Sequence, residues 1–229
     1  MNSHLQHIGI KGLLFDYGGT LDTGGHHWGR VLWRAWQQAG VPVDETRFRE
    51  AYVYGERTLA SRRIVMPDFT FRQTLHEKLR LELSYVDQLP FLSRLTDLVY
   101  AEAVRHTAHS REVLVRLSED FPMVLVSNFY GNIAVVLREF GLDGLFRQVV
   151  ESAVVGVRKP DPRIFRLGVE ALQLAPAQVA VVGDSLQKDI IPARQAGCYT
   201  IWMKGQQWSD DPVDERVPDQ IITDLNELL

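Results

Sequence analysis

Hydrophobic residues follow two different patterns along the 229 residues of the chain. Over about residues 22–105 they recur every three or four positions, which is the period of a helix with one buried face. In residues 1–21 and 106–229, short continuous apolar runs alternate with helical segments, as in a parallel sheet whose strands are buried on both faces. The pattern therefore predicts an α/β protein that contains an all-helical insertion.

The continuous apolar runs predict six short strands. The first begins near Ile10 and ends at Asp16, and the glycines Gly18 and Gly19 that follow favour a tight turn. The remaining strands are expected at Met123–Ser127, Gln148–Glu151, Val179–Gly183, Tyr199–Met203 and Gln220–Ile222. Because ligands of open α/β sheets bind outside the carboxyl ends of parallel strands, the residues that follow these strands are candidates for chemistry.

Helical spacing predicts four helices in the insertion and four in the sheet region. The first spans Trp28–Ala39, and the second begins at Asp44 as its N-cap. Two further apolar stripes cover residues 71–83 and 92–103. In the sheet region, helices are expected near Arg111–Leu117, Asn132–Phe140, Arg163–Leu172 and Asp189–Ala196. The last of these contains Pro192, which a helix tolerates only in its first turn, so that helix is expected to start later.

Composition and charge exclude several classes of partner. Lysine and arginine number 25 and aspartate and glutamate 29, which gives a net charge of −4 and no basic footprint of a nucleic-acid binder. The single cysteine, Cys198, cannot form an internal disulfide and fits a reducing compartment. The first residues do not resemble a secretion signal, and no apolar run approaches the ~20 residues of a membrane span. We therefore expect a cytoplasmic protein, monomeric or a small homo-oligomer, that binds neither nucleic acid nor membrane.

Polar residues that are suited to catalysis follow several of the predicted strands. They are Asp16 after the first strand, the pair Ser127 and Asn128 at the end of the second, Lys159 in the segment Val157–Pro162, and Asp184 and Asp189 after the fourth. Each alone has an ordinary structural explanation, such as a helix N-cap, a turn or an exposed loop. Their joint occurrence at successive strand ends makes those explanations improbable as a set.

In this order and at these intervals, the four motifs resemble those of the haloacid dehalogenase superfamily, a large group of hydrolases that use an aspartate nucleophile. The resemblance covers essentially the whole chain. It implies a Rossmann-like, doubly wound parallel-sheet core of residues 1–21 and 106–229. It also implies an all-helical cap domain, inserted just after the first motif, and the helical region of residues 22–105 occupies that place.

The resemblance also implies roles for the residues that would meet a phosphoryl group. Asp16 would attack phosphorus and form an aspartyl phosphate, which divides hydrolysis into two easier steps. Ser127 and backbone amides near Asn128 would bind phosphoryl oxygens by hydrogen bonds. Lys159 would neutralise charge on the nucleophile and on the phosphoryl group, as a transition state with spread negative charge requires.

The cofactor that the resemblance implies is Mg²⁺, an ion that prefers oxygen ligands. Asp16, Asp184 and the backbone carbonyl of Gly18 would hold it, with waters completing the octahedron. Asp189 would be an additional ligand, or would orient Lys159 or a metal-bound water. The expected function is therefore a Mg²⁺-dependent phosphatase that acts on a small phosphorylated metabolite.

One position departs from the usual pattern of the family's phosphatases. Gly18 stands where a second aspartate usually protonates the leaving group and then activates water. Glycine cannot transfer a proton, and a positioned acid or base typically contributes about 10²–10⁴-fold, so a lower rate is expected. His26 and His27 are candidates for the missing acid, although adjacent histidines beside glycines are more often exposed loop residues.

Two alternative functions remain open. A carbon–halogen hydrolase needs no leaving-group acid, but that branch of the family typically has a tyrosine two residues after the nucleophile and lacks the paired aspartates. Here Tyr17 follows the nucleophile directly, and Asp184 and Asp189 are both present. The other alternative is a catalytically weakened member that binds a ligand or a protein partner.

The cap region also contains arginines that either contact an anionic substrate or form a solvated helix face, namely Arg57, Arg62 and Arg63.

Overall fold

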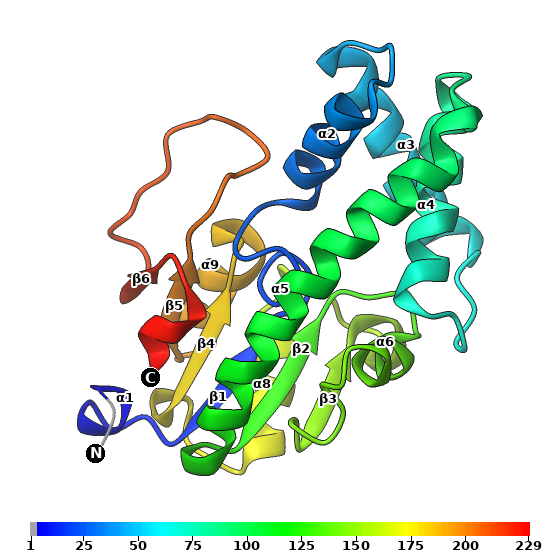
Figure 1. The fold of residues 1–229 in the computed structure, drawn as a ribbon. Helices are drawn as coiled ribbons and strands as arrows, with labels where there is room; N and C mark the ends of the chain where they lie inside the picture. Colours follow the sequence, from blue (N-terminus) through cyan, green and yellow to red (C-terminus); the bar gives the residue numbers. More distant parts are fainter. Residues whose placement is uncertain (1–3) are drawn as a thin grey trace.

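A parallel sheet of six strands organises the protein, and the computed structural model describes residues 4–229 (Figure 1). The strands lie in the order β3-β2-β1-β4-β5-β6, and every neighbouring pair is parallel. Their bounds are Gly12–Phe15 for β1, Met123–Ser127 for β2, Gln148–Glu151 for β3, Val179–Gly183 for β4, Tyr199–Met203 for β5 and Gln220–Ile222 for β6. The strand order reverses between β1 and β4, which makes the carboxyl end of β1 a topological switch point.

Side chains of the central strands alternate between two hydrophobic cores. In β1, Leu13 and Phe15 belong to one core, whereas Leu14 belongs to the other. In β4, Val182 joins the first core and Val181 the second. Every residue of β1, β2 and β4 is buried. Burial on both faces explains why these strands are continuous apolar runs in the sequence.

Helices cover both faces of the sheet, so the predicted α/β fold class is confirmed (Figure 1). The helices of the core region are α1 (His4–His7), α5 (Leu92–Asp120), α6 (Ile133–Glu139), α7 (Ser152–Val155), α8 (Arg163–Leu172) and α9 (Ile191–Gln195). Helical turns also occur at Leu89–Phe91, Pro176–Gln178, Leu186–Ile190 and Leu225–Leu228. Pro192 lies in the first turn of α9, which confirms the later start expected for that helix.

Three helices lie beyond the carboxyl edge of the sheet, in the region for which a cap is predicted, and they are called the cap helices below (Figure 1). They are α2 (Trp28–Ala39), α3 (Glu45–Arg62) and α4 (Phe71–Tyr85). Each begins at a side chain that accepts a hydrogen bond from a backbone amide of the first turn, and these residues are His27, Asp44 and Thr70. Inside the cap, the rings of Trp36 and Phe48 are fully buried with centroids 5.1 Å apart.

Helix α5 is longer than the hydrophobic pattern predicts. Residues 92–103 and Arg111–Leu117, predicted as separate helices, belong to one helix of 29 residues, so this part of the prediction is wrong. The buried stripe continues between them through Thr107 and Ser110, and the Ser110 hydroxyl donates to the backbone oxygen of Leu21 at 2.7 Å. Because polar residues fill these buried positions, apolar spacing alone does not reveal the continuity. The proposed boundary between cap and core, at residues 105 and 106, thus falls inside a continuous helix.

The segment between β5 and β6 extends from the core toward the cap. It leaves the sheet after Met203, and Figure 1 shows it rising beside α2 before it returns to Gln220. Within residues 4–229, no helix combines the length and the apolar composition that crossing a membrane requires.

Gly168 marks the point where α8 touches the sheet, and it provides a test of this packing. A β-carbon added there would lie 2.9 Å from side-chain atoms of Leu14 and of Val126. We expect Gly168→Val to lower the free energy of unfolding by about 1–3 kcal/mol, because the larger side chain overpacks the second core. Urea unfolding followed by circular dichroism measures the change. Glu170→Val places the same side chain at an exposed position of α8, and an equal loss in both variants would contradict the prediction.

Candidate active site

The central strands bring the predicted site residues to one edge of the sheet. Asp16 follows β1, Ser127 ends β2 and Asp184 follows β4, and these three strands are neighbours. A cavity of about 590 Å³ lies at this edge. All seven residues that the motifs predict line it, namely Asp16, Gly18, Ser127, Asn128, Lys159, Asp184 and Asp189. The structure therefore gathers the whole predicted set around one space.

Lys159 lies between two of the carboxylates. Its Nζ atom is 2.5 Å from Asp16 Oδ1 and 2.6 Å from Asp189 Oδ1. Burial alone lowers the pKa of Lys159, but the adjacent carboxylates outweigh that effect and raise it above its ordinary value. The second oxygen of Asp189 accepts a hydrogen bond from the Ser185 amide at 3.1 Å. The lysine therefore stays charged and touches an oxygen of the predicted nucleophile.

Asn128 fixes the loop that carries Lys159. Its Oδ1 atom accepts a hydrogen bond from the Lys159 amide at 2.9 Å, and its Nδ2 atom donates to the Lys159 carbonyl at 3.1 Å. The oxygen and the nitrogen of the Asn128 side chain are thus both hydrogen-bonded to the backbone of Lys159. The side chain of Asn128 positions the lysine, while binding of phosphoryl oxygens by the neighbouring backbone amides stays a prediction.

Three carboxylates approach one another closely enough to share a cation. Asp16, Asp184 and Asp189 each offer an oxygen, and these oxygens lie within 4.8 Å of one another. The Thr20 hydroxyl oxygen lies 3.4 Å from Asp16 Oδ2 and 3.3 Å from Asp184 Oδ1. Gly19 has a φ of 101°, and a β-carbon there would overlap the Asp184 carboxylate. Glycine is required at this position, both for the backbone conformation and for the close approach.

The balance of charge in this cluster favours a divalent cation. Three buried carboxylates face one ammonium group. Burial raises the pKa of Asp16 to about 6, with Lys159 opposing the rise. Burial, followed by the charges of Asp189 and Asp16, raises the pKa of Asp184 well above its ordinary value. A hard cation with a preference for oxygen ligands would stabilise the ionised carboxylates, so the residues present fit Mg²⁺.

Gly18 differs from its neighbour because nothing in the structure requires glycine there. Its φ lies outside the left-handed region, and a β-carbon at this position would have Trp28 Nε1 as its nearest neighbour, at 3.9 Å. The position therefore has room for a side chain that projects into the cavity.

Asp22 is a site residue that the motif analysis did not single out. Its carboxyl group is buried, lines the cavity and accepts hydrogen bonds from the Gly19 amide at 2.7 Å and from Trp28 Nε1 at 3.1 Å. Burial raises its pKa to about 8 although both hydrogen bonds oppose the rise. Asp22 lies six residues after Asp16 in the same motif, and this position is the sequence signal that could have indicated a site residue.

His26 and His27 lose their physical support as the missing acid. Burial, together with the charge of Lys188, lowers the pKa of His27 to about 4, and its Nδ1 atom accepts a hydrogen bond from the Gly29 amide at 3.0 Å. Burial also lowers the pKa of His26, whose Nδ1 atom accepts from the Gln206 amide at 2.9 Å. Both rings are neutral at pH 7 and accept a hydrogen bond at Nδ1, so neither is an imidazolium that could protonate a leaving group.

The cap helices contribute an ion pair to the cavity, in which Lys78 is buried and Glu56 is partly exposed. Lys78 of α4 pairs with Glu56 of α3 and lies 3.0 Å from Glu82, and both Lys78 and Glu56 line the cavity. Helical spacing did not reveal these residues, because charged residues on a cap helix ordinarily face solvent. The arginines considered as contacts for an anionic substrate are exposed and lie outside the lining, namely Arg57, Arg62 and Arg63. Their exposure agrees with the alternative explanation that these arginines form a solvated helix face.

Comparison with known proteins places this arrangement in a family. Residues 10–197 match the model of a hydrolase family described as haloacid dehalogenase-like hydrolase. Phosphoglycolate phosphatase of Vibrio cholerae is 26% identical over 227 residues, which cover 96% of each chain. Phosphoserine phosphatase of Thermus thermophilus is 42% identical over 88 residues, which cover 38% of this chain and 34% of that protein. The chain thus spans only about a third to two fifths of the length of the curated relatives that it matches at 35% identity or more.

Solved structures show the same fold. A dehalogenase is similar with a TM-score of 0.62 and 19% identity, covering 96% of both chains. A HAD phosphatase from Thermococcus onnurineus has a TM-score of 0.55 and 20% identity over the same shares, and a putative HAD-hydrolase of Bacillus subtilis, bound to magnesium, has 0.57 and 17%. Because the family model covers most of the sequence and the strand-end residues meet as the motifs predict, the chain belongs to the haloacid dehalogenase-like hydrolases.

Proposed function

We propose that this hydrolase is a Mg²⁺-dependent phosphatase that acts on monoesters of small metabolites through an aspartyl phosphate on Asp16. The observation that carries the proposal is the buried cluster at the switch point, where Lys159 touches Asp16 and three carboxylates can share a cation. The phosphatase names of relatives from Vibrio cholerae and Thermus thermophilus support the same class of substrate.

The residues of the cluster are suited to transfer of a phosphoryl group in two steps. An oxygen of Asp16 attacks phosphorus, the bond to the leaving oxygen breaks, and that oxygen takes a proton from water or from a group in the cavity. Water then attacks the same phosphorus atom, which releases phosphate and restores the carboxylate. Lys159 lies against the nucleophile and places positive charge where the transition state carries spread negative charge.

The residues that would hold Mg²⁺ are already fixed in place. They are the carboxylates of Asp16, Asp184 and Asp189. We propose the backbone carbonyl of Gly18 as a fourth ligand of the ion. When bound, the ion would supply positive charge to the phosphoryl oxygens. Thr20 bridges two of the carboxylates, and Trp202 Nε1 donates to the Asp184 carbonyl at 2.7 Å. These two contacts keep the ligands in place without the ion.

The two alternatives have less support. A metal-free carbon–halogen hydrolase has no use for Asp184 and Asp189 as paired ligands, and the likeness to a dehalogenase at 19% identity concerns the fold alone. A catalytically weakened family member that only binds a ligand would have no need of a lysine in contact with the nucleophile Asp16. Mg²⁺-dependent hydrolysis of 4-nitrophenyl phosphate separates the phosphatase from both alternatives.

Asp16→Asn tests the nucleophile. Because an amide cannot form the acyl phosphate, we expect kcat for 4-nitrophenyl phosphate to fall at least about 10³-fold. The melting temperature should stay close to that of the parent, since the substitution preserves shape and removes one charge from an acidic cluster. Activity within a few-fold of the parent, at an unchanged melting temperature, would rule Asp16 out as the nucleophile.

The pH dependence of stability tests the metal site. Folding raises the pKa of Asp16 from 3.8 to about 6 and that of Asp22 from 3.8 to about 8. These two carboxyl groups therefore bind more protons in the native state than in the unfolded state between about pH 4 and pH 8, so without metal their contribution to the free energy of unfolding falls as the pH rises through this window. Mg²⁺ favours the ionised carboxylates, and we expect it to raise the melting temperature more at about pH 8 than at about pH 5.

Asp184→Ala should abolish most of this Mg²⁺ effect together with turnover, because it removes an oxygen ligand. Asp143→Ala, which removes an exposed carboxylate on the surface, provides the matched control. An equal Mg²⁺-induced rise of melting temperature in the parent and in Asp184→Ala would show that the ion binds elsewhere.

Gly18→Asp tests the missing acid. Because Gly18 has no acid side chain, the parent should hydrolyse esters with acidic leaving groups much faster than alkyl esters. The new carboxyl group fits the space at this position and should flatten that dependence, by about 10²–10⁴-fold for poor leaving groups. Rates for a series of aryl and alkyl phosphates measure the slope. A shallow slope in the parent would instead indicate a proton donor already present, and Asp22→Asn would then test the buried carboxyl group of that residue.

A further inference from the structure

The cavity is large for a substrate that is little more than a phosphate. Its volume of about 590 Å³ falls within the range of about 300–1,000 Å³ that is typical of sites for drug-sized ligands. The carboxylates at the sheet edge form one part of the lining. Residues of the cap helices and of the 207–213 segment, between β5 and β6, form much of the rest. A leaving group of substantial size therefore has room beside the transferred phosphoryl group.

Three rings, Trp208, Tyr52 and His27, form an aromatic wall of this cavity. The ring centroid of Trp208 lies 4.8 Å from that of Tyr52 and 5.2 Å from that of His27, with interplanar angles of 36° and 35°. Aromatic surface that faces a cavity is favourably covered by another flat ring, because both surfaces leave water and the rings stack.

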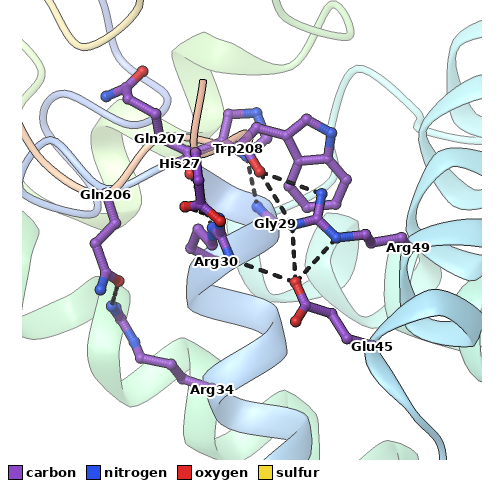
Figure 2. Close-up of polar contacts among 10 residues, drawn as sticks. His27, Gly29, Arg30, Arg34, Glu45, Arg49, Gln206, Gln207 and Trp208 are labelled. Carbon is purple, nitrogen blue, oxygen red and sulfur yellow. Dashed lines mark hydrogen bonds and ion pairs between the residues drawn. The ribbon is translucent and has the colours of Figure 1, made fainter. Parts of the chain in front are cut away.

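The cap holds the Trp208 ring in one position. A β-carbon on Gly29 of α2 would overlap its six-membered ring, so the ring lies directly against the helix backbone. The guanidinium carbon of Arg49 lies 4.3 Å from the ring centroid, and Arg49 donates two hydrogen bonds of 3.2 Å to the Trp208 carbonyl (Figure 2). Arg49 and the backbone of Gly29 thus cover parts of the ring, and a ligand that packs against the part lining the cavity does not have to immobilise it.

The backbone that precedes Trp208 is anchored to the same helix. Arg30 Nε donates to the Gln207 carbonyl at 2.9 Å, and the His27 amide donates to the Gln206 carbonyl at 2.9 Å (Figure 2). Arg34 Nη1 also donates to the Gln206 side chain at 2.6 Å. The aromatic wall thus joins one residue of the core segment to two residues of the cap.

A charged pair lies next to the aromatic wall. Lys78 Nζ is 4.2 Å from the ring centroid of Tyr52, and Lys78 is paired with Glu56. Burial alone raises the pKa of Glu56, but the adjacent Lys78 more than offsets this and lowers it. Both groups therefore carry charge at neutral pH and offer a donor and an acceptor to polar atoms at the edge of a bound ring.

We propose that Trp208 determines specificity, and that the leaving group of the substrate carries a planar ring that packs against the aromatic wall with its polar edge toward Glu56 and Lys78. This inference rests on the proposed phosphatase function and names its class of substrate. A wall that served only as a contact between cap and core would behave differently, because its loss would affect every substrate alike.

Benzyl phosphate and butyl phosphate provide the test. Both release an alkyl alcohol of similar acidity, so the ratio of their kcat/KM values reports on the ring and not on the proton donor that Gly18 lacks. We expect the parent to prefer the benzyl ester by about 10-fold, the size of one good aromatic contact. Trp208→Leu should reduce the ratio to about 2-fold or less, and Gly29→Ala should do the same because it displaces the Trp208 ring. Trp33→Leu removes a ring that packs on Phe48 outside the cavity lining, and it should keep the parent's ratio.

The affinities of the protein for benzylphosphonate and butylphosphonate, measured by calorimetry, repeat the comparison without turnover. In the parent protein, this measurement tests the ring preference even if a variant fails to fold. Absence of a ring preference in the parent, or an equal loss for both ligands in Trp208→Leu, would overturn the inference. Failure of Mg²⁺ to support hydrolysis of either ester would count against the phosphatase function instead. In that case a benzylphosphonate preference that depends on Trp208 would still support the ring site.

Discussion

The charge of Lys159 is the constraint around which the site is built. A buried ammonium group is tolerated only where carboxylates replace the water that it has lost. Asp16, at the end of β1, and Asp189, in the turn after β4, provide that replacement, while Asn128 holds the lysine's backbone. Segments after two neighbouring strands therefore place a carboxylate on Lys159 Nζ, and the segment after a third strand holds the lysine's backbone. The carboxylates gathered around the lysine favour the binding of a cation.

Two adjacent glycines show how similar residues in a motif serve different ends. Gly19 has a positive φ and lies against the Asp184 carboxylate, so any side chain there would disturb the cluster. Gly18 has neither restriction. At position 18, glycine leaves the site without an acidic side chain but does not determine its shape. At position 19, the backbone conformation and the close approach of Asp184 both depend on glycine.

Much of this arrangement could be predicted from local signals. The six strands are continuous apolar runs because both faces of the sheet are buried, and the strand-end motifs placed Asp16 and Asp184 correctly at one edge. The continuity of α5 was missed because Thr107 fills a buried position that the apolar pattern does not count. The aromatic wall was missed because it depends on contacts between residues far apart in the chain, such as Arg30 and Gln207, which are 177 positions apart.

Helix α5 also joins the cap helices to the core as one continuous element. Its 29 residues form a rod about 43 Å long, with Leu114 and Leu117 in the core at one end and Leu95 beside the cap helices at the other. A tilt of about 5° at the core end displaces the cap end by roughly 4 Å. Because α5 is continuous across the predicted boundary between cap and core, a displacement of the cap helices relative to the sheet would have to tilt α5 or bend it.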